Sequence, residues 1–150
     1  MRKSIYICHP FTTHGDPAAN FDAQAKIGQL IFEAGFIPVS PILAFGKVIP
    51  HDAENYNRAM ASCLWLLAKC DEVWVFGDWV QSRGCNLEVR FAERMNTNVR
   101  DGRTTLLELV PPSRFWEVFE PTQPEAADAT PASPAEPPVQ QSLGSAESCE

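Results

Sequence analysis

Hydrophobic residues along the first 120 positions follow two different periods. Short runs rich in β-branched and aromatic side chains predict buried strands at residues 4–8, 36–40 and 72–76. Between these runs, apolar residues recur every three or four positions, which predicts amphipathic helices. Residues 104–109 predict a fourth strand and residues 114–119 a last helical or extended piece. The alternation predicts an α/β fold, namely a doubly wound (flavodoxin-like) parallel sheet of four to five strands with helices on both faces.

Punctuating residues mark the ends of the first helix. Asp16 is suited to be its N-cap and Pro17 to occupy its first position, while Gly35 ends it. The predicted apolar face consists of Ile27, Leu30, Ile31 and Ala34. Pro38 lies inside the second predicted strand, and proline lacks the N–H that a central strand needs, so this strand is expected at a sheet edge.

The following segments lead to the most informative stretch of the chain. Residues 41–50 form a mostly apolar loop that is a candidate lid, and a helix is expected over residues 55–68. Its buried positions are expected to be Met60, Cys63, Leu64 and Leu67. After the third strand, a polar loop runs from Gly77 to Gly84 and another helix begins. The apolar positions of this helix are expected to be Leu87, Phe91 and Met95.

Composition limits the kind of protein. Five cysteines, odd in number and scattered through predicted core segments, favour a reduced cytoplasmic setting over a disulfide framework. No run approaches the length of a membrane span, and no signal-peptide pattern is present, so no membrane partner is expected. The chain has no basic stripe, which argues against duplex nucleic acid as a partner. The histidines and cysteines lack the spacing of zinc ligands, so neither a metal site nor a cofactor is expected.

The last thirty residues have a different composition. From Pro121 to Glu150 there are six prolines, six alanines and five acidic residues, with no lysine, arginine or aromatic residue. Such a segment cannot bury enough apolar surface to fold. We therefore predict one domain over residues 1–119 and a disordered acidic tail over residues 120–150, which carries most of the net charge of −7.

Candidate chemistry gathers beyond the carboxyl ends of the first and third strands, where open parallel sheets bind ligands. Glu88 lies in the first turns of the helix after Gly84, so we expect its carboxylate to be ionised and able to act as a nucleophile. The alternative is an acid that merely stabilises the helix dipole. Tyr6 on the first strand is either part of the same site or an ordinary strand aromatic. Asp78 either binds a sugar hydroxyl or protonates a base, or is a turn residue.

Several neighbouring residues are candidates for substrate binding. The loop His9-Pro10-Phe11-Thr12 follows the first strand and should face the same crevice. His9 or Thr12 either holds a phosphate there or is an exposed polar loop residue, which is the commoner case. Trp79 is suited to stacking on a base. Ser82 and Gly84 precede a helix and offer amides to a phosphate, although capping alone is their commoner role.

These residues resemble a known family. Tyr6 on the opening strand, the sequence Trp65-Leu66-Leu67 before Cys70-Asp71, and above all residues 82–88 (SRGCNLE) followed by Ala92 are similar to the nucleoside 2-deoxyribosyltransferase-like superfamily. That group includes deoxynucleoside 5′-monophosphate N-hydrolases and small uncharacterised relatives. The resemblance covers roughly the first 110 residues.

The resemblance implies a function. It implies cleavage of the N-glycosidic bond of a nucleoside or nucleoside 5′-monophosphate through a glutamate nucleophile, Glu88, by hydrolysis or by transfer. Tyr6 would lie beside the nucleophile. It also implies a homodimer or larger homo-oligomer, because sites in this family are commonly completed by a neighbouring subunit. Exposed aromatic residues near the site, Phe45, Trp65 and Trp79, agree with such an interface.

One departure from the family pattern keeps alternatives open. Family enzymes usually carry an aspartate in the helix before the central strand, whereas this chain has Met60-Ala61-Ser62-Cys63 there. Asp78, or a water held by Tyr6, is then the candidate source of the leaving group's proton. A non-catalytic nucleotide-binding or sensing module is one alternative function. Hydrolysis of another ribosyl bond derived from a nucleotide, such as that in NAD, is the other.

Overall fold

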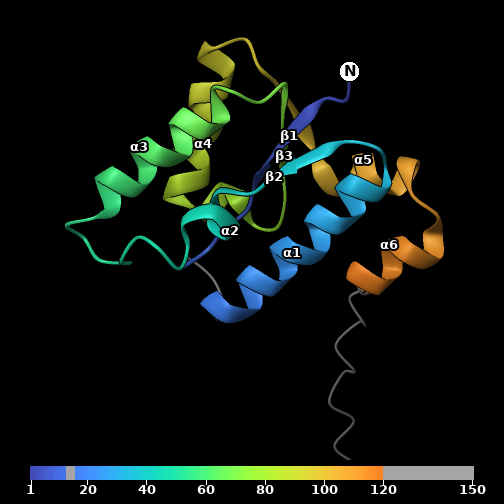
Figure 1. Ribbon diagram of the computed structural model, residues 1–150, viewed down its shortest axis with the longest axis horizontal. Helices are drawn as coiled ribbons and strands as arrows, with labels where there is room; N and C mark the ends of the chain where they lie inside the picture. The colour runs from blue at the N-terminus through green and yellow to red at the C-terminus, as the bar shows by residue number, and fades with distance from the viewer. Residues whose placement is uncertain (13–15, 120–150) are drawn as a thin grey trace, which may run out of the picture.

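The computed structural model describes residues 1–12 and 16–119. Four strands form one parallel sheet in the order β2-β1-β3-β4. Figure 1 shows this sheet between two helical layers, with α3 and α4 on one side and α1, α5 and α6 on the other. The strands are β1 (Ser4–Cys8), β2 (Ile37–Val39), β3 (Glu72–Val75) and β4 (Asn98–Asp101). The helices are α1 (Pro17–Glu33), α2 (Pro41–Phe45), α3 (Tyr56–Leu67), α4 (Arg83–Arg94), α5 (Gly102–Leu109) and α6 (Pro112–Val118), with a 3₁₀ turn, η1 (Trp79–Gln81).

This architecture confirms the predicted doubly wound α/β fold. The strand order reverses between β1 and β3, so the connections after these two strands leave towards opposite faces of the sheet. Such a topological switch point opens a crevice at the carboxyl ends of the strands. The edge position of β2 agrees with the proline inside it.

The alternation of side chains along β1 decides which residues reach the crevice. Ile5 and Ile7 pack into the core on the α1, α5 and α6 side, while Tyr6 and Cys8 point to the α3 and α4 side. All four side chains are buried. Because successive strand residues face opposite sides, Tyr6 is directed towards α4, the helix that carries Glu88.

The predicted limits of α1 are confirmed. Asp16 is its N-cap and accepts a hydrogen bond from the Ala18 amide, and Pro17 occupies the first turn. The chain leaves the helix through Gly35, whose φ of +92° is in the left-handed region that glycine adopts without strain. The predicted apolar face packs on the sheet, since Ile27, Leu30 and Ile31 are buried.

The predicted fourth strand is wrong. Residues 104–109 lie within helix α5, and the fourth strand is β4, which ends at Asp101. The Asp101 carboxylate accepts a hydrogen bond from the Thr104 amide and caps α5. Leu106 and Val110, four residues apart, then bury one helical face. A short apolar run is compatible with a strand or with a helix, and here the N-cap at Asp101 favours the helix.

The predicted apolar face of α4 is also wrong. Leu87 and Met95 are exposed, and Phe91 is only half-buried. The face that packs on the sheet consists of Cys85, Glu88, Val89 and Ala92. A buried carboxylate therefore occupies a position that would otherwise suit an apolar residue.

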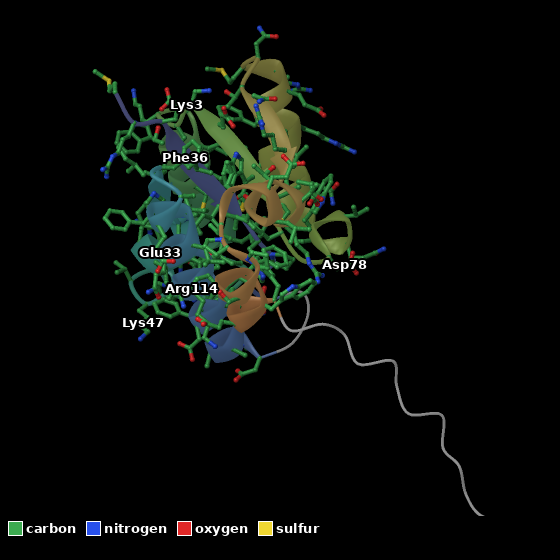
Figure 2. All side chains as sticks on the ribbon, turned by 90° about the vertical axis from the view of Figure 1, so that its right-hand side faces the viewer. Lys3, Glu33, Phe36, Lys47, Asp78 and Arg114 are labelled. Carbon is green, nitrogen blue, oxygen red and sulfur yellow. The ribbon has the colours of Figure 1, made fainter. Side chains whose placement is uncertain are left out.

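The remaining predictions concern the two ends of the domain. The candidate lid at residues 41–50 contains the short helix α2, and the piece at residues 114–119 is mostly helical in α6. The ion pair between Arg114 and Glu33, at 2.7 Å, joins α6 to α1 (Figure 2). The predicted tail at residues 120–150 lies outside the described residues. Within the described residues, no helix is long and apolar enough to cross a membrane.

Candidate functional site

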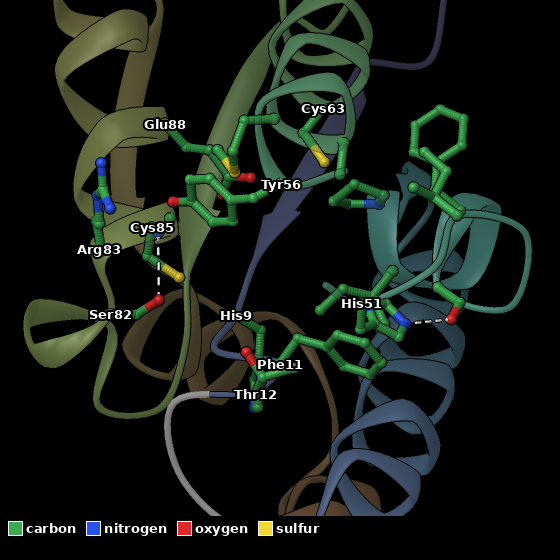
Figure 3. A pocket seen from close by; sticks show the side chains of 18 of the residues that line it. His9, Phe11, Thr12, His51, Tyr56, Cys63, Ser82, Arg83, Cys85 and Glu88 are labelled. Carbon is green, nitrogen blue, oxygen red and sulfur yellow. Dashed lines mark hydrogen bonds between the residues drawn. The ribbon is translucent and has the colours of Figure 1, made fainter. Parts of the chain in front are cut away.

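A cavity of about 550 Å³ opens where the sequence analysis placed the crevice. Four parts of the chain surround it: the loop after β1, α2 with the segment that follows it, α3, and the first turns of α4 (Figure 3). The lining residues are His9, Phe11, Thr12, Pro41, Ile42, Phe45, Gly46, Ile49, Pro50, His51, Asp52, Ala53, Tyr56, Ala59, Met60, Cys63, Ser82, Arg83, Gly84, Cys85 and Glu88.

Glu88 and Tyr6 form the polar contact at the inner end of this cavity. The Tyr6 hydroxyl donates a hydrogen bond to Glu88 Oε1 at 2.8 Å. Only 6% of Glu88 and none of Tyr6 is exposed to solvent. Since Tyr6 is fixed by β1, this bond holds the carboxylate in one orientation and leaves its second oxygen available to other groups.

The buried position changes the charge expected on Glu88. Burial raises the pKa of Glu88 to about 7, although hydrogen bonds from Cys8 and Tyr6 act in the opposite direction. The sequence analysis expected the helix N-terminus to keep this carboxylate ionised. Glu88 lies in the second turn of α4, where the dipole effect has already weakened. Desolvation therefore prevails, and near neutral pH the group exists as a mixture of acid and carboxylate.

Burial has the same effect on the tyrosine. It raises the pKa of Tyr6 well above its usual value, and the nearby Glu88 carboxylate adds to the shift. The hydroxyl is therefore protonated throughout the physiological range and acts as a hydrogen-bond donor to Glu88.

The start of α4 is fixed by its own side chains. The buried Ser82 is the N-cap and accepts a hydrogen bond from the Cys85 amide at 3.4 Å. Asn86 donates from its side chain to the carbonyl oxygens of Val80 and Ser82, at 2.6 and 2.9 Å. These bonds tie the loop after β3 to the helix, so that Ser82 and Gly84 line the cavity as the sequence predicted.

The loop after β1 forms another wall. His9, Phe11 and Thr12 line the cavity, in agreement with the prediction, whereas Pro10 is buried and does not line it. Burial lowers the pKa of His9, so its imidazole is neutral at pH 7. The ring of Phe11 makes an edge contact with His51, with the ring centroids 4.6 Å apart. This contact joins the β1 loop to the segment after α2.

Two predicted site residues lie elsewhere. Asp78 is exposed on the outer surface beside η1 (Figure 2) and does not line the cavity. Trp79 packs against the core on the α3 and α4 side and is also absent from the lining. The loop after β3 turns outwards at Gly77, whose φ is +61°, before it returns at Ser82. The structure thus does not bring Asp78 or Trp79 together with Glu88.

The lining also includes residues that the sequence did not indicate as site residues, among them Tyr56, Cys63 and Arg83. Figure 3 shows Tyr56 and Cys63 of α3 opposite the first turns of α4, which carry Arg83. The Arg83 guanidinium lies over the Tyr56 ring, 5.3 Å from its centroid. The Tyr56 hydroxyl is buried and has no hydrogen-bond partner among the described residues. Nothing in the spacing of the sequence indicates that these side chains meet.

Acidic groups are scarce in the lining. Besides Glu88, the lining residues that the structure describes include one carboxylate, Asp52. The Asn55 amide and side chain donate to Asp52 and hold its pKa below the usual value, so it carries no proton at neutral pH. The lining residues of α3 include Met60 and Cys63 but no acid. The aspartate that the sequence lacks in this helix is therefore not replaced by another acid of α3 in the cavity lining.

The fold is that of the 2-deoxyribosyltransferases. A solved structure of the 2-deoxyribosyltransferase from the bacterium Bacillus psychrosaccharolyticus, described as a biocatalyst for nucleoside synthesis, matches with a TM-score of 0.50 and 18% sequence identity. The match covers 64% of this chain and 69% of that one, and at this identity it shows the fold alone. The chain belongs to a domain family of unknown function (DUF7768), which matches residues 3–101. No sequence among curated proteins matches it.

Proposed function

We propose that this protein cleaves the N-glycosidic bond of a nucleoside or nucleoside 5′-monophosphate, with Glu88 as the nucleophile. The observation that carries the proposal is the buried Glu88 carboxylate at the inner end of the cavity, oriented by the Tyr6 hydroxyl at 2.8 Å. A buried acid is unfavourable for folding, which makes it a candidate for a functional group. The likeness of the fold to that of a 2-deoxyribosyltransferase supports the class of substrate.

The reaction begins with the ionised form of Glu88. The carboxylate oxygen that Tyr6 does not hold forms a bond to the anomeric carbon of the sugar as the bond to the base breaks. Positive charge develops on the sugar in an oxocarbenium-like transition state, and a carboxylate beneath it is stabilising. Tyr6 continues to donate to Oε1, so the carboxylate does not have to reorient during attack.

The departing base takes the electrons of the broken bond and needs a proton. Asp52 is ionised, His9 is neutral and α3 contributes no acid, so none of these groups is a strong proton donor at pH 7. We propose that water in the open cavity supplies the proton. A second water then hydrolyses the sugar ester and regenerates Glu88, or a second base accepts the sugar and the result is transfer. Bases that leave readily should be preferred.

The test is release of free base from a panel of nucleosides and 5′-monophosphates, followed by chromatography. The wild type should release base and Glu88→Gln should not, because the amide cannot stabilise the charge. Glu93→Gln is the matched control, since Glu93 lies on the same helix but is exposed. The rate of the wild type should rise with pH through about 7 as Glu88 ionises. Equal release by wild type and Glu88→Gln would refute the mechanism.

A binding or sensing module is the second candidate function. The absence of an acid among the cavity-lining residues of α3 favours it, because such a site binds a nucleotide without a group that assists the departing base. Binding measured by calorimetry, without release of base over prolonged incubation, would support the module and contradict the enzyme.

A further inference from the structure

Two cysteines lie beside Glu88. Cys8 ends β1 and Cys85 is in the first turn of α4, 77 positions further along the chain. Their sulfur atoms and a carboxylate oxygen of Glu88 all lie within 4.8 Å of one another. All three residues are buried, and both cysteines are free thiols. In the cleavage mechanism, Cys8 contributes only its hydrogen bond to Glu88, and Cys85 has no role.

We propose that Cys8, Cys85 and Glu88 bind one thiophilic divalent cation, of which Zn²⁺ is the common biological example. Two thiolates and a carboxylate are a ligand set that zinc accepts, whereas Mg²⁺ and Ca²⁺ prefer oxygen ligands alone. A tetrahedral zinc ion with bonds of about 2.3 Å to sulfur and about 2.0 Å to oxygen separates its ligands by about 3.5–3.8 Å. The ligand atoms, which lie within 4.8 Å of one another, therefore need to move closer by about 1.3 Å at most.

The surroundings of the three ligands suit an open metal site. Cys85 and Glu88 line the cavity, so a fourth ligand, water, has access from that side. Tyr6 donates to Oε1 of Glu88 and orients the carboxylate, as outer hydrogen bonds do for metal ligands. Both thiols give up their protons to solvent as the ion binds. The sequence analysis expected no metal site because the ligands come from distant segments, not from a local spacing.

The ion has a consequence for the carboxylate. A cation bound to Glu88 occupies the lone pair that would attack the sugar, so the metal-loaded protein is an inhibited form. This consequence rests on the proposed function, whereas binding of the ion does not. The two ideas can therefore fail separately.

The binding test uses the full chain with Cys149→Ser, which removes the thiol outside the described residues, and no substrate. Titration with Zn²⁺ by calorimetry should give one site per chain. Titration with Cd²⁺ should give the ultraviolet absorbance of two cadmium–thiolate bonds. Cys8→Ser, Cys85→Ser and Glu88→Gln should each weaken affinity by at least about tenfold. Cys70→Ser is the matched control, since Cys70 is half-buried outside the cluster. Mg²⁺ should give no saturable signal.

Two results would overturn the site: no saturable binding of Zn²⁺ or Cd²⁺, or unchanged affinity in a folded Cys8→Ser variant. If Cys8→Ser does not fold, the cadmium absorbance of the parent protein decides, because fewer than two thiolates per ion excludes this ligand set. The inhibitory role is tested by base release. Zn²⁺ should inhibit the parent, and at least about tenfold more Zn²⁺ should be needed for Cys8→Ser. Equal sensitivity of the two proteins would refute inhibition through this site.

Discussion

Glu88 combines the chemistry of a nucleophile with a position that opposes its ionisation. The same burial that raises its pKa to about 7 excludes water, which strengthens electrostatic interactions with a substrate. An exposed acid at this point of α4 would be more fully charged but better hydrated. Burial of Glu88 therefore lowers the stability of the folded protein but makes the carboxylate more reactive, a compromise that is common at functional sites.

The first prediction concerns stability and pH. The folded pKa of Glu88, about 7, is above the ordinary value of 4.5 expected in the unfolded chain. Between these values the native state binds more protons than the unfolded state, so this group makes the free energy of unfolding fall as pH rises from 4.5 to 7. The loss is on the order of 3 kcal/mol.

Glu88→Gln removes this term, so the variant should be more stable than the wild type above pH 7 and similar to it below pH 4.5. Urea unfolding of both proteins at pH 4.5 and 8 measures the difference. Parallel stability curves for the two proteins would show that the carboxyl is not desolvated.

The second prediction concerns Tyr56. Within the part of the chain that the structure describes, its buried hydroxyl has no hydrogen-bond partner, and an unsatisfied buried donor is unfavourable by about 1–3 kcal/mol. A polar group of the substrate in the cavity is the natural partner. Tyr56→Phe should therefore unfold at the same or a higher temperature, while KM rises by about 2–12-fold, the equivalent of one hydrogen bond. A variant that is less stable and has an unchanged KM would contradict this role.

Sequence reasoning reached some site residues and not others for a physical reason. The β1 loop and Glu88 were predicted from the position of ligand sites at strand ends, and Tyr6 was placed beside Glu88 by the resemblance to a known family. Whether Tyr56 and Cys63 face the cavity depends on how α3 is rotated about its axis. A mixed apolar and polar pattern does not determine that rotation. The buried face of α4 includes Glu88 itself, and the apolar residues of this helix did not predict that face correctly.

At the scale of elements, caps and glycines were more informative than short apolar runs. Asp16 and Gly35 gave the limits of α1 correctly, because Asp16 caps the helix with its own side chain and Gly35 ends it through a positive φ. The run at residues 104–109 misled, because an N-cap at Asp101 outweighed its strand-like composition. The edge strand was identified by Pro38, whose missing N–H is a local property.

The third prediction tests the start of α5. A Cβ on Gly102 would lie 2.1 Å from the ring of Phe76, a buried side chain that stacks on Phe119. Gly102→Ala should therefore lower the free energy of unfolding by about 1–3 kcal/mol. Gly28→Ala is the control, because its Cβ would meet atoms only at 3.7 Å and alanine favours the interior of α1. The comparison is made by urea unfolding, and equal losses in both variants would contradict the packing argument.

At the scale of the whole molecule, self-association remains a prediction. Of the three aromatics that suggested an interface, Trp65 on α3 is 64% exposed. Phe45 lines the cavity and Trp79 packs partly on the core. Light scattering at micromolar concentration should show a dimer or larger species, and Trp65→Lys should shift it towards monomer. A monomeric wild type would exclude the interface.

The last prediction concerns where the folding unit ends. The family match stops at residue 101, yet the core on the α1 side is completed by residues beyond it. Phe115 of α6 is 1% exposed and contacts the ring of Phe119, which stacks on Phe76.

A chain cut after Phe119 should therefore keep the melting temperature of the full protein to within about 2 °C, because it retains every residue of both core clusters. A chain cut after Val110 loses Phe115, Phe119 and the ion pair from Arg114 to Glu33. Burial of one such aromatic contributes about 1.5–3 kcal/mol, so this shorter chain should melt at least about 10 °C lower or fail to fold. Calorimetry of the two truncated chains beside the full protein makes the comparison. A large loss on removal of residues 120–150 alone would mean that the domain extends beyond Phe119.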